Sequence, residues 1–227
     1  MLASGSGGIP TAFIVDKTGH LAWIGHPMKM EEPLEKIIAG KWDLAAYQKQ
    51  MAEEAALDAA SRELNGQIGA AMKADDSKAA IAAMDAAFAK TPKLEARFGP
   101  FKFKLLLDGA DFDGGYAYGA KLVDGVLKDD GQQLNGIAWT IVDPDSKYEK
   151  RDLKLALKAA LRSNELTKSQ DAGVLDTLAR VYFLSGDAAK AVEFQTKALE
   201  LVKDNPDATK DFQGRLDEYK KGKPAGT

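Results

Sequence analysis

The 227-residue chain has no cysteine and only two histidines. Without cysteine it can form no disulfide and no thiolate metal site, and thiol–disulfide exchange is excluded because that reaction requires a thiolate. No apolar run approaches the ~20 residues that cross a bilayer, so we expect no membrane partner. The net charge is −3 and no basic run exceeds Lys220-Lys221. We therefore expect no nucleic-acid partner, since nucleic-acid binding requires a concentrated basic face.

Residues 8–25 form the most readable stretch of the chain. Two short runs, 12–15 and 21–24, are rich in the β-branched and aromatic residues typical of strands. The turn Asp16-Lys17-Thr18-Gly19 separates them. Asp can start a turn by bonding its own backbone, and Gly can adopt the positive φ that closes a bulged hairpin. The pattern predicts one β-hairpin in a chain that is otherwise helical.

The order Ile9-Pro10-Thr11, strand, Asp-x-x-Gly turn, second strand and Gly25 resembles the C-terminal half of a thioredoxin-superfamily domain, closest to its thiol–disulfide oxidoreductases. The resemblance covers about residues 7–42, including a helix at about 31–39. It implies a cis peptide bond before Pro10. Only residues 1–7 precede the hairpin, so the family's first half and its cysteine motif are missing. We expect a redox-inactive remnant of that fold, which arises either from a longer gene that was cut or from a start codon chosen internally.

Residues 1–8 are small and lack the apolar core of a secretory signal. The sequence otherwise leaves the cellular compartment open.

From residue 43 to near the C-terminus, apolar residues recur at helical spacing, and Gly/Asp turns separate the segments. We expect the Gly99-Pro100 pair to break or kink one of these helices. The predicted helices span residues 43–74, 77–90, 94–107, 115–127, 132–142, 151–166, 171–184, 188–202 and 208–221.

The unit at 171–206 resembles a tetratricopeptide repeat. Small residues at Ala179, Ala191 and Ala198 would let two helices approach closely, and Pro206 ends the unit. The unit departs from the family pattern at Gln195, where an aromatic residue is expected. The predicted fold is mostly α: a thioredoxin-like hairpin and helix (1–42) followed by a tetratricopeptide-like α-solenoid (43–227). The resemblance implies a non-catalytic scaffold that binds a peptide or protein on its repeats.

Aromatic residues cluster between 98 and 118 and suggest two interpretations. They could line a groove for a peptide or small ligand, or they could be core between stacked repeats. The binding candidates are Phe101, Phe112, Tyr116 and Tyr118.

An enzymatic alternative places a hydrolytic or metal-assisted site at His20, His26 and Asp16. The competing interpretation is that His20 is an exposed strand residue and His26 a loop residue. The Asp-rich run at 108–114 loosely resembles a calcium loop, but its ligand spacing fails. We therefore predict no metal and no cofactor.

A last expectation concerns assembly. In the resembled fold, the first strand of this hairpin has a second partner strand that the chain lacks. An unpaired strand edge is a template for another chain. We therefore expect that two copies could pair edge to edge through Ala12, Phe13, Ile14 and Val15. The alternative is that the hairpin packs on the first long helix and the protein is a monomer.

Overall fold

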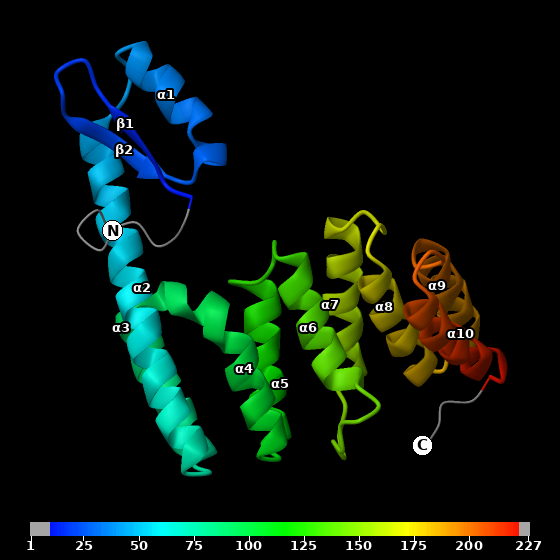
Figure 1. The fold of residues 1–227 in the computed structure, drawn as a ribbon. Helices are drawn as coiled ribbons and strands as arrows, with labels where there is room; N and C mark the ends of the chain where they lie inside the picture. The colour runs from blue at the N-terminus through cyan, green and yellow to red at the C-terminus, as the bar shows by residue number, and fades with distance from the viewer. Residues whose placement is uncertain (1–9, 223–227) are drawn as a thin grey trace. The chain divides into compact units, whose positions relative to one another are not determined.

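The computed structural model describes residues 10–222 (Figure 1). This part of the chain is 72% helical, with ten α-helices and one two-stranded sheet. The predicted mostly α fold class is therefore confirmed. The peptide bond before Pro10, the segment 1–8 and most of the tail expected at 222–227 lie outside the described residues.

The hairpin forms where the sequence predicts it. Strands β1 (Ala12–Val15) and β2 (Leu21–Gly25) are antiparallel, and a register shift between Ile14 and Val15 marks a bulge. Asp16 starts the turn, because its Oδ1 accepts the amides of Thr18 at 2.8 Å and His20 at 3.0 Å. Gly19 has a φ of +85°, which glycine adopts without a steric cost.

The chain forms two compact units, residues 1–60 and 61–227. The N-terminal unit contains the hairpin, the 3-10 turn η2 (Pro27–Lys29) and helix α1 (Glu31–Ile38). The long helix α2 (Leu44–Lys73) belongs to both units.

The C-terminal unit is a series of antiparallel helix pairs. The elements after α2 are α3 (Ser77–Lys90), η3 (Pro92–Leu94), α4 (Glu95–Asp108), α5 (Phe112–Asp124), α6 (Gly131–Val142), α7 (Leu153–Leu166), α8 (Ala172–Leu184), α9 (Ala188–Leu201) and α10 (Pro206–Lys220). Helix α4 packs on α5, α6 on α7 and α8 on α9, while α6 also contacts α8, and α10 packs on α9 (Figure 1).

Acidic and amide residues in the turns act as helix N-caps. Each accepts a backbone N–H of the first helical turn, which satisfies a donor that has no partner inside the helix. This explains why the turns of the sequence are rich in Asp. The caps with a side-chain hydrogen bond on α3 and on α5–α10 are Asp76, Asp111, Asp130, Asp152, Asp171, Asp187 and Asn205.

Two predictions for these helices differ from the structure, for identifiable reasons. Helix α5 spans Phe112–Asp124 rather than 115–127, and it begins early because the Asp111 side chain accepts the amide of Gly114 at 3.1 Å. Of the predicted break or kink at Gly99-Pro100, the break does not occur, because α4 continues from Glu95 to Asp108 with Pro100 inside it. The adjacent Gly99 is buried against α5, and this packing outweighs the local preference of proline to end a helix.

Close helix contacts depend on residues with little or no side chain. A Cβ added at Gly119 would lie 2.6 Å from a ring carbon of Phe103, and one added at Gly115 would lie 2.7 Å from Leu107. Both glycines lie on α5 and face α4. Further along the chain, alanine rather than glycine occupies such close contacts. The fully buried alanines are Ala156, Ala159, Ala160, Ala179, Ala191 and Ala198.

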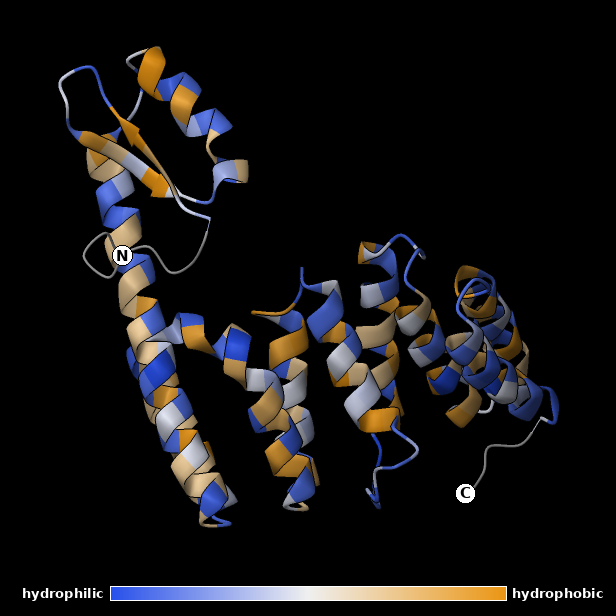
Figure 2. Ribbon diagram, viewed as in Figure 1, coloured by the Kyte–Doolittle hydropathy of each residue, from blue (hydrophilic) through white to orange (hydrophobic). Residues whose placement is uncertain are grey.

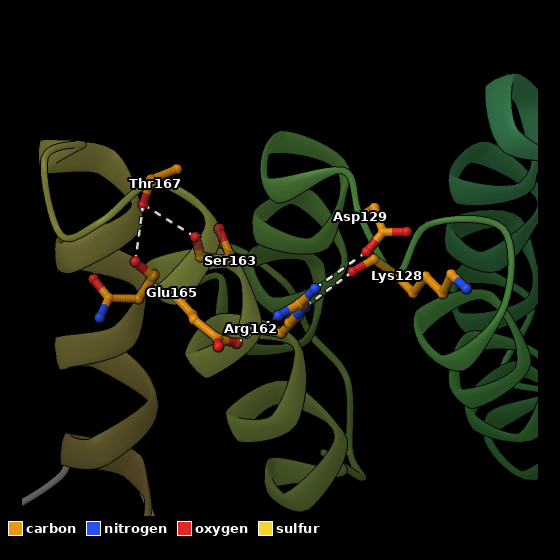
Figure 3. Close-up of polar contacts among 7 residues, drawn as sticks. Lys128, Asp129, Arg162, Ser163, Glu165 and Thr167 are labelled. Atoms are coloured by element: carbon orange, nitrogen blue, oxygen red, sulfur yellow. Dashed lines mark hydrogen bonds and ion pairs between the residues drawn. The ribbon is translucent and has the colours of Figure 1, made fainter.

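Polar contacts from α7 hold the turn that precedes α6. Arg162 on α7 reaches back to the turn before α6, where it donates to the Lys128 carbonyl at 3.0 Å and pairs with Asp129 at 3.1 Å (Figure 3). It also pairs with Glu165 on its own helix at 2.6 Å. Ser163 donates to the carbonyl of Gly131 at 2.7 Å. These bonds fix the turn that starts the α6–α7 pair.

The C-terminal helix is the most polar of the series, and Figure 2 shows hydrophilic residues over much of α10. Its inner side is nevertheless anchored, because Leu216 and Tyr219 are buried. A polar outer face is what the last element of a stacked series requires for solubility.

We predict that Ala191→Leu destabilises the C-terminal unit by ~1–3 kcal/mol, because it overpacks a closed contact. Ala191 is fully buried beside Ala179 and Phe183. Its neighbour Ala189 is exposed on the same helix, so Ala189→Leu is the matched control and should change the free energy of unfolding by less than about 0.5 kcal/mol. Urea unfolding measures both. Equal effects of the two substitutions would show that Ala191 does not face a partner helix.

Candidate functional site

A cavity of about 570 Å³ lies where α4 and α6 end. Its walls are the last turn of α4, the first residue of α5, the last turn of α6 and the connector 143–149. Three aromatic side chains, Phe112, Trp139 and Tyr148, line it. We call this cavity the aromatic pocket. Its volume falls in the range of small-ligand sites, about 300–1,000 Å³.

The aromatic side chains of the pocket hold one another in place. The Phe112 and Tyr148 rings meet edge to face, with centroids 6.2 Å apart and planes at 72°. On its other side Phe112 stacks on Tyr116 at 6.4 Å, and Tyr116 in turn packs on Phe103 at 6.3 Å. Edge-to-face and offset geometries are those that aromatic pairs prefer. The pocket wall therefore continues into the core of the α4–α5 pair.

Hydrogen bonds from Arg151 and Tyr116 hold the connector between α6 and α7. Arg151 donates through one guanidinium nitrogen to the Ser146 carbonyl at 2.8 Å and through another to the Ile141 carbonyl. Tyr116 donates to the carbonyl of Lys150 at 2.6 Å. Burial lowers the pKa of Arg151, but a guanidinium remains charged in proteins. These bonds hold the connector as a wall of the pocket.

Asp108 links the two sides of the pocket. Its carboxylate accepts a hydrogen bond from the Tyr148 hydroxyl at 2.8 Å and pairs with Lys104 at 2.6 Å. Burial, and then the hydrogen bond to Asp108, raise the pKa of Tyr148 well above its ordinary value. Tyr148 is therefore a neutral donor, and a role as general base at neutral pH is not supported.

The structure separates the four binding candidates of the sequence. Phe112 lines the aromatic pocket and Tyr116 packs directly behind it. Tyr118 lies elsewhere on α5, with the Lys102 ammonium 4.4 Å from its ring centroid. Phe101 is partly exposed on α4 and is not among the residues that line the aromatic pocket.

Sequence reasoning missed Trp139, Tyr148 and Asp108 as site residues. Trp139 lies among the apolar residues of α6, and a large aromatic residue at such a position is ordinarily part of the core. Tyr148 lies in a connector without periodicity, so no pattern could place it. That connector is unusually long and carries an aromatic residue among charged ones. These two features of the sequence could have indicated a binding residue there.

The candidates for the enzymatic alternative lie at the surface of the N-terminal unit. Asp16 accepts a hydrogen bond from the Thr18 hydroxyl at 2.6 Å, and this hydroxyl lies 2.8 Å from Nδ1 of His20. The hydrogen bond from Thr18 and the amide of His20 lower the pKa of Asp16. His26 instead caps η2. Within residues 10–222 there is no group of three or more His, Asp or Glu side chains that could hold a metal.

The two edges of the hairpin differ. The Tyr47 hydroxyl accepts the N–H of Ile24 at 2.9 Å and donates to its carbonyl at 2.8 Å, and the Trp42 indole N–H donates to the Ala22 carbonyl at 3.0 Å. Side chains therefore cover the outer edge of β2. Phe13 lies opposite Ile24. Residues of one antiparallel pair share their orientation, so Phe13 directs its N–H and C=O to the outer edge of β1.

That outer edge of β1 has no partner strand among the described residues. Phe13 and Val15 are 49% and 58% exposed. The strand is thus open both along its edge and on one face.

No known family model matches the sequence, and no curated protein matches it either. Among the described residues, no helix is both long enough and apolar enough to span a membrane.

We predict that Tyr148→Phe makes the free energy of unfolding depend less steeply on pH above pH 10. A tyrosine whose pKa is raised in the folded state stabilises the fold fully below its unfolded pKa of about 10 and loses this contribution as the pH rises further. The free energy of unfolding of the wild type should fall between about pH 10 and 11.5. The Tyr148→Phe curve should be less steep, by up to about 1.4 kcal/mol per pH unit.

Chemical denaturation at each pH measures this difference. At pH 7 the same substitution should cost about 0.5–1.5 kcal/mol, because only the hydrogen bond to Asp108 is lost. If the free energies of unfolding of the wild type and of Tyr148→Phe fall equally steeply above pH 10, Tyr148 is not buried against Asp108.

Proposed function

We propose that this protein is a non-catalytic scaffold and that a segment of a peptide or protein partner binds the aromatic pocket of its helical array. The observation that carries the proposal is a cavity of about 570 Å³ lined by Phe112, Trp139 and Tyr148. Aromatic side chains in concave sites supply most of the contact energy in peptide and ligand recognition.

The way in which the helices pair supports a tetratricopeptide-like reading of the array. Each helix pair contacts the next through its first helix, as α6 does with α8, and α7 also contacts α8. The small residues Ala179, Ala191 and Ala198 are fully buried. Such arrays stack repeat on repeat and use the extended surface between neighbours for binding. The aromatic pocket lies between two successive pairs.

Buried Gln195 takes the place of the aromatic residue that the repeat pattern leads one to expect. Its amide donates to Asp176 at 2.9 Å and to the Phe212 carbonyl at 3.3 Å, and Asp176 also pairs with Arg215. Phe212 and Arg215 belong to α10. The side chains of Gln195 and Asp176 therefore help to hold this terminal helix against α8 and α9.

A library of fluorescein-labelled heptapeptides, screened by fluorescence anisotropy, tests the proposal. Peptides that bind the wild type should bind Phe112→Ala and Trp139→Ala at least tenfold more weakly. Leu161→Ala removes an exposed apolar side chain from α7, outside the pocket, and should leave the affinity unchanged. Circular dichroism checks that each variant is folded. Unchanged affinity in both pocket variants, or no binder in the library, would contradict the proposal.

We also propose that the hairpin, as a remnant of a thioredoxin-like fold, pairs two copies of the chain through the outer edge of β1. The specific support is the difference between the edges: Tyr47 and Trp42 cover β2, whereas Phe13 directs its backbone groups outward from β1. Such an edge can form a continuous sheet with an identical strand.

We predict that Phe13→Pro converts the dimer to a monomer. Proline removes the outward N–H of β1 without removing a hydrogen bond between β1 and β2. Phe13→Val is the control, because it keeps the N–H and a strand-forming side chain. Light scattering at micromolar concentration measures the mass. A monomeric wild type, or a Phe13→Pro variant that stays dimeric, would overturn the dimer.

A further inference from the structure

We infer that the aromatic pocket selects a lysine or arginine side chain of the bound segment. This inference rests on the proposed scaffold function and adds the chemistry of the ligand to it. Three independent features of the pocket favour a cation: its charged side chains, the helix ends that point to it, and the faces of its aromatic rings.

The charged side chains around the pocket have an acidic excess. Four carboxylates line it, those of Asp108, Asp143, Asp145 and Glu149, against two ammonium groups, those of Lys104 and Lys147. Arg151, behind the connector, is a third cation. The guanidiniums of Arg180 and Arg215 also lie near the pocket, but each is paired with a carboxylate outside its lining, Glu218 and Asp176. The carboxylates of the pocket therefore still exceed the cations that have no such partner. An anionic ligand would therefore meet net repulsion.

Two of these carboxylates have no hydrogen-bond or ion-pair partner among the described residues. Lys104 is already paired with Asp108, and Asp143 accepts the amide of Asp145 at 2.9 Å. The carboxylates of Asp145 and Glu149, by contrast, form no hydrogen bond or ion pair with another residue in the described part of the chain. They are available to a cation from outside.

Two helices end at the pocket. The C-terminus of a helix carries the negative end of its dipole, equivalent to about half an elementary charge. Helix α4 ends at Asp108 and α6 at Val142, and neither has a basic residue in its last turn. Arg151 already donates to the Ile141 carbonyl at the end of α6. Arg180, which is paired with Glu218, also donates to the Val142 carbonyl at 3.4 Å. The end of α6 thus already attracts cations, and the same field favours a further cation on the open side of the pocket.

The aromatic rings suit a cation and its alkyl stem. The Arg215 guanidinium lies 5.5 Å from the Trp139 ring centroid, so this indole already accepts a guanidinium as a neighbour. The charge of Arg215 is itself matched by Asp176. Aromatic faces attract ammonium and guanidinium groups, and the methylene stems of Lys and Arg pack on apolar surface. Phe112 and Tyr148, which also line the pocket, supply further apolar surface.

Three fluorescein-labelled heptapeptides test the inference on the full chain: Gly-Ser-Lys-Leu-Lys-Ser-Gly and its counterparts with both lysines replaced by Gln or by Glu. Anisotropy titrations at about 50 mM salt should show the Lys peptide binding at least tenfold more tightly than the Glu peptide, with the Gln peptide between them. Raising the salt should weaken the Lys peptide most, because salt screens exposed charges.

The double variant Asp145→Asn/Glu149→Gln should reduce the affinity of the Lys peptide at least fivefold and leave that of the Gln peptide unchanged. The control Glu200→Gln/Asp204→Asn makes the same change of net charge at two exposed positions, one in the last turn of α9 and one in the turn that follows it. It should bind the Lys peptide like the wild type.

The outcomes separate this inference from the scaffold function. If all three peptides bind equally, or the Glu peptide binds best, and Trp139→Ala abolishes the binding, the pocket binds peptides but does not select a cation. Equal losses in the pocket variant and in the control would also overturn cation selection. If none of the three peptides binds at millimolar concentration, the inference and the scaffold function both fail.

Discussion

The close approach of paired helices at residues without a side chain is the constraint on which the C-terminal unit depends. Gly115 and Gly119 let α5 lie against Leu107 and Phe103 of α4 with no room for a Cβ. This contact fixes Tyr116, and through it Phe112, at the end of the pair. The short connector 109–111 and the long connector 143–152 then leave a cavity between successive pairs. The pocket is therefore a consequence of helix packing as well as of the residues that line it.

Much of the fold follows from local sequence signals. The hairpin forms at the predicted residues, because Asp16 and Gly19 supply turn chemistry that few other residues can. Most helices begin and end within one or two residues of their predicted limits, because Asp and Asn caps mark their starts. The failures occur where contacts distant in sequence decide the outcome. Pro100 stays inside α4 because Gly99 packs on α5, and this contact has no local signature.

The site was predictable only in part. Phe112 was among the predicted binding residues, but Tyr118 lies elsewhere on the same helix, because residues six apart on α5 contact different neighbours. Trp139 and Tyr148 could not be found from periodicity. The first lies on an apolar helix face that also faces the cavity, and the second depends on bonds from Arg151 that order its connector. A pocket whose wall is an irregular connector can be located only once the tertiary structure is known.

The central claim is that a cationic peptide binds at the ends of α4 and α6. The most direct test is a map of ¹H–¹⁵N chemical-shift changes in the full chain during titration with the Lys heptapeptide. The account predicts that the indole N–H of Trp139 and the amides of 104–112 and 139–149 shift together. The indole N–H groups of Trp23 and Trp42, in the N-terminal unit, should not move. Shifts confined to other residues, with Trp139 unchanged, would contradict the account.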